Sequence, residues 1–343
     1  MRAVSGLADL VGQEEAVNHL TRLLASDRLA HALLFVGPES TGKGTAARSL
    51  ARALFCHDPN VSPGEACGAC DGCTKMQENC HGDFHEVVVK TKTIPVAAIR
   101  DATRQLSLRS VESGAKVLLI EGADRMNASA QNALLKTLEE PPGATHIILT
   151  TSRLRAILPT VVSRCQRVHF APLPTDALAK VVAERRGLGP EQAQMLAALA
   201  QGSLGMALEL DYEALIVRRD QVAAIDEALE GRTPKSAIEA LAAAADISGD
   251  RAELSATLDL FLVWLHDQIL IASEAPLGGL ANVDRRAQLE HLAQTRGLSA
   301  ILARAEDVME AKRQVEARFN WNAQMITEQL CLSLAGHHKL PRL

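Results

Sequence analysis

Short apolar runs alternate with longer amphipathic segments over the first half of the chain. The runs are residues 32–36, 85–89, 117–120, 146–150 and 166–170. The segments between them that are typical of helices include 46–54, 95–108 and 129–138. Alternation of buried strands with helices is typical of a mostly parallel sheet covered on both faces. We therefore predict an α/β domain over residues 1–173.

The strand pattern stops at Pro174, and the rest of the chain favours helices alone. Segments 176–186, 190–200 and 202–210 predict three short helices separated by glycine and proline, and together they form a small domain over residues 174–211. Longer amphipathic segments follow, which predict a helical packing or assembly domain over residues 212–343. The predicted fold class is α/β followed by all-α.

Composition narrows the class of protein. The chain has 343 residues, enough for two or three domains, and its 47% apolar and 22% charged residues are typical of a globular protein. Few aromatic residues beside abundant alanine and leucine argue against an all-β fold. A net charge of -5 argues against a protein that coats nucleic acid through bulk electrostatics, although local basic contacts stay open.

We expect a cytoplasmic protein that does not enter a membrane. No uninterrupted apolar stretch reaches the ~18 residues of a membrane span, because Asp259, His266 and Asp267 interrupt the richest one, residues 258–272. Residues 1–17 lack the pattern of a secretion signal. In a reducing compartment, the seven cysteines are expected to be free thiols or metal ligands rather than disulfides.

A phosphate-binding loop is predicted between the first strand and the helix that follows it. Residues 37–45 have the spacing G-x-x-x-x-G-K in a strand, loop and helix context. Backbone N–H groups and the start of the helix favour phosphate there, and Lys43 adds a positive charge. The candidate nucleotide-binding residues are Gly37, Thr41, Gly42, Lys43, Gly44, Thr45 and, from the next motif, Glu121.

The same site lacks groups that hydrolysis requires. The residue after Lys43 should carry a hydroxyl for Mg²⁺, but it is Gly44, and Thr45 is rotated by about 100° on the helix. After strand 117–120, Glu121 takes the metal-orienting position, while Gly122 stands where a water-activating glutamate is expected. Asp124 either caps the next element or substitutes for that glutamate. The sequence leaves binding of ATP and Mg²⁺ at this site open, and we expect poor turnover.

Four cysteines predict a structural zinc site within a module over residues 56–80. Cys67, Cys70 and Cys73 form two overlapping C-x-x-C steps, and Cys56 precedes them. Four thiolates can close a tetrahedral Zn²⁺ site with no open position. The alternatives are free or redox-active thiols, or a histidine in place of one thiolate. The candidate histidines are His57, His81 and His85, and the cysteines left over, for which we expect burial, are Cys80, Cys165 and Cys331.

Several segments together resemble the bacterial clamp-loader branch of the AAA+ ATPases, over roughly residues 7 to 210. They are VGQ at 11–13, AHALLF at 30–35, the phosphate loop, NALLKTLEEPP at 132–142 and SRC at 163–165. The resemblance implies an AAA+ P-loop domain with a zinc module, a small helical lid domain over 174–211 and a collar domain over 212–343. It also implies a role in DNA polymerase III, without a polymerase active site in this chain.

Within that branch the chain resembles a stator rather than a motor. Motor subunits carry Lys-Ser/Thr, an Asp-Glu pair and a sensor arginine in the lid, whereas this chain has Gly44, Glu121-Gly122 and Gly205. The resemblance makes Arg164 an arginine finger that acts in trans on the ATP site of a neighbouring subunit. The alternative for Arg164 is a surface arginine in a local ion pair.

The resemblance also implies partners. They are the motor (gamma or tau) and delta subunits in a hetero-pentamer at the replisome and nucleoid, primer–template DNA, and the sliding clamp weakly or indirectly. Arg100 and Arg104, spaced i, i+4, are candidates for DNA phosphate contact, and a solvated helix face is the alternative. Two rival functions stay open: a competent ATPase motor, and a zinc-stabilised AAA+ adaptor unrelated to replication.

Overall fold

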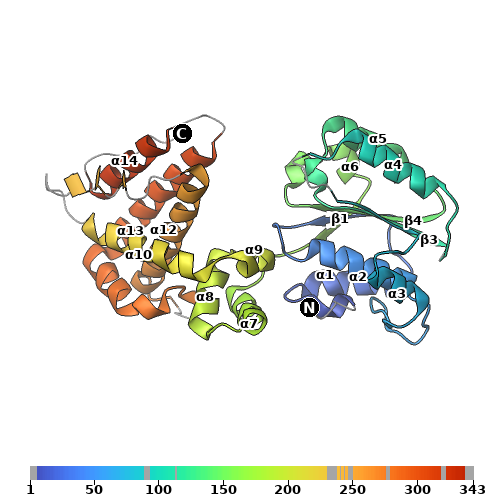
Figure 1. The fold of residues 1–343 in the computed structure, drawn as a ribbon, viewed down its shortest axis with the longest axis horizontal. Coiled ribbons are helices and arrows are strands. Elements are labelled where there is room, and N and C mark those ends of the chain that lie inside the picture. Colours follow the sequence, from blue (N-terminus) through green and yellow to red (C-terminus); the bar gives the residue numbers. More distant parts are fainter. Residues whose placement is uncertain are drawn as a thin grey trace. The chain divides into compact units, whose positions relative to one another are not determined.

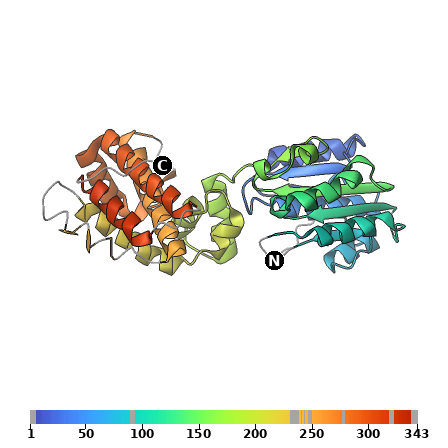
Figure 2. The same cartoon turned by 90° about the horizontal axis from the view of Figure 1, so that it is seen from above.

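A computed structural model describes most of the chain and divides it into two compact units. The described residues are 6–88, 93–112, 114–229, 238–239, 241–242, 244–245, 250–275, 279–317 and 322–336. The first unit, here called the sheet unit, comprises Met1–Ala177 with Gly202–Gly205. The second, the helical unit, comprises Leu178–Gln201 with Met206–Leu343 (Figures 1 and 2).

The sheet unit is built on five parallel strands in the order β2-β3-β4-β1-β5. The strands are β1 (Ala32–Val36), β2 (Phe84–Val87), β3 (Ala115–Ile120), β4 (Ala144–Thr151) and β5 (Gln166–His169). The predicted parallel sheet is confirmed, with strand ends that differ by a few residues. Residue 89, the last of one predicted strand, lies outside the described residues.

Helices cover both faces of this sheet (Figure 1). On one face lie α1 (Glu14–Ala25), α2 (Lys43–Phe55) and α3 (Asp71–Gln77). On the other lie α4 (Val96–Ser107), α5 (Ala128–Glu139) and α6 (Pro159–Val162). The described residues of the unit also contain the 3₁₀ turns η1 (Leu7–Asp9), η2 (Ala123–Arg125) and η3 (Leu154–Ala156).

Alternating side chains of the strands make two separate cores. Leu33 and Phe35 of β1 pack in the cluster that includes α1 and α2, whereas Leu34 packs in the cluster that includes α4 and α5. Because both faces are buried, β1 is continuously apolar, which is why its bounds could be predicted. The carboxyl ends of parallel strands meet at one edge, so the residues after β1, β3 and β4 converge there.

The described part of the helical unit contains helices and no strand, as predicted (Figures 1 and 2). The helices are α7 (Thr175–Arg186, whose first turn belongs to the sheet unit), α8 (Pro190–Leu199), α9 (Leu204–Glu209), α10 (Tyr212–Ala228), α12 (Arg251–Ala272), α13 (Arg286–Glu316) and α14 (Ala323–Leu334), with the 3₁₀ turn η5 (Val283–Arg285). Gly297, at φ 73°, breaks α13 into two helical segments.

Helix α12 contains the apolar segment 258–272, which the sequence predicts to be too interrupted to span a membrane. It has 22 residues and a mean hydropathy of 1.4 over its richest window, so by length and composition it could cross a membrane. Half of that window is buried inside the protein, and the carboxylate of Asp267 is fully buried. Asp267 accepts hydrogen bonds from the N–H groups of Ala281 (3.1 Å) and Asn282 (2.8 Å). These contacts are those of a helix inside a bundle.

One buried carboxylate joins three helices of this unit. Asp226 of α10 accepts hydrogen bonds from Trp264 and Gln268 of α12, each at 3.0 Å. It also pairs with Arg296 (2.7 Å) and Arg304 (2.6 Å) of α13. Burial alone would raise the pKa of Asp226, but the two guanidinium groups prevail and lower it. The acid is therefore ionised in the folded protein.

We predict that Asp226→Asn lowers the free energy of unfolding by about 3–5 kcal/mol at pH 7, because two buried guanidinium groups lose their counter-charge. Since the folded-state pKa is lowered, this stabilisation is present above the unfolded pKa of about 3.9 and is lost as the pH falls through the folded value. Urea unfolding at several pH values measures both effects.

Glu227→Gln, an exposed neighbour on the same helix, should change stability by less than about 0.5 kcal/mol. An Asp226→Asn variant as stable as the unchanged protein would contradict the assignment.

Candidate nucleotide and zinc sites

The phosphate loop lies between β1 and α2, as predicted. Gly42, at φ 92°, is the cap residue of α2, and Lys43 is its first residue. Lys43 Nζ donates to the carbonyl oxygens of Gly37 (2.8 Å) and Pro38, and its side chain is buried. Burial lowers the pKa of Lys43, while Glu39, Asp124 and Glu121 act in the opposite direction. The lysine is thus held inside the loop that it is expected to serve.

Two other residues shape the loop. A Cβ at Gly37 would overlap the carbonyl oxygen of Phe170, so only glycine fits there. Thr41 is buried, and its hydroxyl donates to the carbonyl oxygen of Pro38 at 2.9 Å. Thr45, the remaining candidate of the loop, is half-buried on α2. The structure therefore brings together all the loop residues that the sequence predicted.

Glu121 extends from the end of β3 into the space beside Gly44. A Cβ at residue 44 would overlap Glu121 Oε1 and would lie 3.1 Å from Arg48 Nη1. Arg48 pairs with Glu121 at 3.2 Å and also with Glu86 of β2. Burial raises the pKa of Glu86, and Arg48 opposes that shift. The acid expected to orient a metal is therefore paired with an arginine that the sequence did not single out.

Asp124 does not cap the next helix, so that expectation is wrong. Its carboxylate accepts a hydrogen bond from Thr151 Oγ1 (3.1 Å) and pairs with Arg153 (3.0 Å). Thr151 is the last residue of β4, and Arg153 follows two residues later. The cap of α5 is Asn127, which accepts from the N–H of Ala130 at 2.9 Å. Gly122, at φ 67°, directly follows Glu121 and offers no side chain at the position where a water-activating glutamate is expected.

Gly205 lies against the phosphate loop. A Cβ at this position would be 2.8 Å from the side-chain atoms of Ser40, which itself has a positive φ of 55°. The position at which the resemblance expects a sensor arginine is therefore close to the loop and carries no side chain.

The four predicted cysteines form one cluster. Cys56 follows α2, Cys67 and Cys70 lie in the next loop, and Cys73 belongs to α3. Their sulfur atoms all lie within 4.8 Å of one another, and within the described residues this is the one group of three or more metal-binding side chains. N–H groups of Cys67 and Cys70 donate to sulfur at 3.3 Å. The cluster fits tetrahedral zinc through sulfur alone.

The thiols of this cluster do not titrate alike. Burial raises the pKa of Cys70, but backbone N–H groups of His57 and Cys73 and the neighbouring thiols outweigh it and lower the pKa to about 6. Burial raises the pKa of Cys73 to about 12. The cluster therefore has a sulfur that is ionised near neutral pH and is ready to bind a cation.

None of the three candidate histidines joins this group. His81 stacks on Phe55 instead, with ring centroids 3.9 Å apart. Of the remaining cysteines, Cys331 is buried and Cys165 is half-buried, but Cys80 is exposed, so burial was the wrong expectation for it. A position next to a turn of polar residues after α3 explains that exposure.

The loop of the zinc module also holds the N-terminal segment, a contact that the sequence did not reveal. The N–H of Leu7 donates to the carbonyl oxygen of Gly64 at 3.0 Å, and the N–H of Ala8 donates to Glu65 Oε1 at 3.1 Å. Leu10, just after this turn, has a methyl group 3.7 Å from where a Cβ of Gly42 would stand. The cysteine module and the phosphate loop thus share one neighbouring segment.

Arg164 lies on the surface of the sheet unit, two residues after the end of α6. Its side chain is 36% exposed and pairs with Glu139, the last residue of α5. Arg164 Nη1 also donates to the carbonyl oxygen of Thr160 at 2.9 Å. The local ion pair that the alternative role predicts is present, and part of the side chain stays accessible.

The two candidate DNA contacts lie on α4. Arg100 and Arg104 are both exposed, and Arg104 is 3.7 Å from Asp101. Their i, i+4 spacing places them on one helical face. Because both side chains are exposed, the structure fits a contact with DNA phosphates and a solvated helix face equally well.

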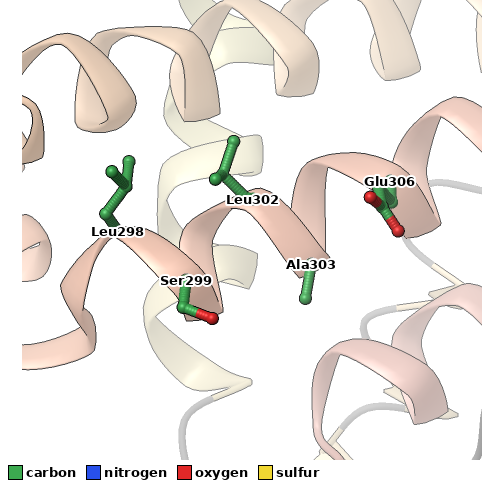
Figure 3. A pocket seen from close by; sticks show the side chains of 5 residues that line it. All are labelled: Leu298, Ser299, Leu302, Ala303 and Glu306. Carbon is green, nitrogen blue, oxygen red and sulfur yellow. The ribbon is translucent and has the colours of Figure 1, made fainter.

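A shallow pocket of about 550 Å³ lies on α13, in the helical unit (Figure 3). Its lining residues are Leu298, Ser299, Leu302, Ala303 and Glu306, none of which the sequence singled out. Leu298 and Leu302 are exposed apolar side chains, and Met309 follows on the same helix. The pocket holds no convergent set of reactive groups and is therefore a surface feature rather than a catalytic site.

Both units of the chain are similar to subunits of DNA polymerase III. Family models described as "DNA polymerase III, delta subunit" and "DNA polymerase III, delta subunit, C terminal" match residues 12–174 and 217–335. The DNA polymerase III subunit delta' of Pseudomonas aeruginosa is 31% identical over 314 residues, which are 90% of this chain and 92% of that protein.

Two further relatives match in part. Subunit delta' of Bacillus subtilis is 35% identical over 198 residues, 58% of this chain and 59% of that protein, so the match spans less than two thirds of its length. Subunit tau of Escherichia coli is 31% identical over 251 residues, 71% of this chain and 39% of that protein.

We predict that the purified chain carries about one zinc ion and that Cys73→Ser removes most of it, because three thiolates and a hydroxyl bind Zn²⁺ weakly. Loss of the metal should lower the melting temperature by about 5 °C or more. Metal analysis and a thermal melt measure the two effects. Cys80→Ser, outside the cluster, is the control and should change neither. Zinc content unaffected by Cys73→Ser would overturn the site.

Proposed function

The chain belongs to the delta' family of DNA polymerase III clamp-loader subunits, and we propose that it is the stator of such a complex. In this role it supports ATP-dependent loading of the sliding clamp on primed DNA without turning over ATP itself. Its partners are motor subunits of the gamma or tau type and a delta subunit, in a ring of five.

The surroundings of the phosphate loop carry this proposal. Gly44, Gly122 and Gly205 each lack a side chain where a motor needs one, and two of them, Gly44 and Gly205, pack against side chains of the site. The residues do not fit catalytic Mg²⁺, since position 44 offers no hydroxyl and Glu121 is paired with Arg48. Asp124 is bound to Thr151 and Arg153 and is not available as a base.

The loop keeps the features that bind phosphate. Gly37, Thr41 and Gly42 shape a turn before α2, and Lys43 supplies a positive charge at its start. Nucleotide binding without turnover is therefore the activity that this site supports. The zinc ion, held by four thiolates, would leave no coordination position open and would be structural.

Arg164 supplies the catalytic contribution of a stator. Its side chain is partly exposed, and in the complex it would leave Glu139 and reach the ATP site of a neighbouring subunit, where it would offset charge on the transferred phosphoryl group. The Ser-Arg-Cys triplet and the family membership support this role over that of a local ion pair.

The helical unit supports assembly, and α4 supports DNA contact. Exposed Leu298, Leu302 and Met309 on α13 offer apolar surface to other subunits of a collar. Arg100 and Arg104 offer positive charge to primer–template phosphates. The sliding clamp is contacted weakly or indirectly, and the protein acts in the cytoplasm at the replisome. The domain bounds at 173 and 211 remain predictions.

We predict that Arg164→Ala, tested in the complete reconstituted complex, leaves assembly intact while DNA-stimulated ATP turnover and clamp loading fall. The neighbouring ATP site should slow by about 10³-fold or more, as expected for a lost arginine finger. Sizing chromatography measures assembly, and phosphate release measures turnover. Arg155→Ala, an exposed arginine of η3, is the matched control. Unchanged turnover would remove the finger assignment, and failure of the unaltered chain to join the complex would favour the adaptor role.

The likeness to tau keeps the motor as the second candidate function. The isolated chain should hydrolyse ATP at a rate indistinguishable from background, and Lys43→Ala should not change that rate. Turnover by the isolated chain that Lys43→Ala abolishes would instead establish a motor.

A further inference from the structure

We propose that Arg48 takes the place of Mg²⁺ in the nucleotide site of this chain, so that a divalent cation adds no affinity for a nucleotide there. The inference rests on the proposed impaired site, and it names the group that occupies the position of the metal. It also makes Gly44, Glu121 and Arg48 one matched set rather than separate departures from a motor.

The geometry begins on α2. Arg48 lies one helical turn after Gly44, so both face the same side of the helix. Its two terminal nitrogens contact different acids: Nη1 is 3.2 Å from Glu121 Oε1, and Nη2 pairs with Glu86. Glu86 belongs to β2 and Glu121 directly follows the neighbouring parallel strand β3, and the N–H of Glu121 donates to the carbonyl oxygen of Val87 at 3.3 Å. The guanidinium thus bridges the ends of β2 and β3 beside the phosphate loop.

The set is sterically complementary. Glutamate is one methylene longer than aspartate, and the Glu121 carboxylate uses that length to fill the volume that a side chain at residue 44 would need. In a phosphate-loop site with Mg²⁺, that volume belongs to the hydroxyl that binds the metal. Here the hydroxyl is absent, and the acid is paired with the arginine instead.

The positive charge of Arg48 also opposes the binding of Mg²⁺. Mg²⁺ requires close, near-octahedral oxygen ligands, so it would have to take Glu121 away from Arg48. The guanidinium cannot lose its proton to relieve the repulsion between the two cations. The side chains of Arg48 and Glu121 are 39% and 30% exposed, so a phosphate chain in the loop can reach donors that Arg48 does not use for the two acids.

Nucleotide binding with and without the metal tests this inference. Calorimetry of the full chain with ATP, in excess Mg²⁺ and in EDTA, should give affinities that agree within about twofold. Arg48→Ala removes the internal cation, and Glu121→Asp shortens the acid so that it no longer reaches the arginine. Each variant should bind ATP about tenfold or more tightly in Mg²⁺ than in EDTA. Arg22→Ala, an exposed arginine of α1, is the control and should behave as the unchanged chain.

The outcomes separate cleanly. A gain of more than about tenfold from Mg²⁺ in the unchanged chain would overturn the inference, and so would the absence of Mg²⁺ dependence in both variants. If the unchanged chain binds ATP neither in Mg²⁺ nor in EDTA, the two variants decide. Binding that is tenfold or more tighter in Mg²⁺ supports the inference, and the absence of that dependence in both variants overturns it. Thermal melts confirm folding, and Glu121→Asp carries the test alone if Arg48→Ala does not fold. Failure here would leave the stator role intact, since that role is tested by Arg164→Ala in the complex.

Discussion

The parallel alignment of the five strands is the constraint on which the rest of the sheet unit depends. Because β1, β2 and β3 end at one edge, the phosphate loop, Glu86 and Glu121 meet there although they are far apart in sequence. The ion pairs of Arg48 in α2 with both acids form at this edge. The common direction of the strands therefore brings the residues of the site together, and the individual side chains then determine its chemistry.

Much of this arrangement could be predicted from sequence, for physical reasons that differ by element. β1 is buried on both faces and is continuously apolar, and the cysteine spacing brings its four sulfurs together through local turns. The role of Asp124 could not be predicted, because its partners Thr151 and Arg153 lie at and just after the end of β4, with a helix and a strand between them and Asp124 in sequence. Arg48 was missed because one more arginine on an amphipathic helix carries no signal until Glu86 and Glu121 are placed around it.

Polar groups set the internal order of both units, although apolar packing supplies most of the burial. In the helical unit, Asp226 fixes α10 against α12 and α13 through directional bonds that apolar contacts alone would not specify. In the sheet unit, Lys43 bonds to the carbonyl oxygens of its own loop, which gives the loop a defined shape before any phosphate arrives. Asp226 is satisfied by groups distant in sequence and so depends on the completed tertiary fold, whereas the partners of Lys43 are local to its loop.

The bond between Ala8 and Glu65 has a consequence for biosynthesis. These residues are 57 positions apart, and Glu65 stands two residues before the second cysteine of the cluster. A ribosome releases Ala8 before Glu65, so neither this hydrogen bond nor the one from Leu7 to Gly64 can form until the cysteine loop has emerged. Full attachment of η1 is therefore completed only after residues 64 and 65 have left the ribosome.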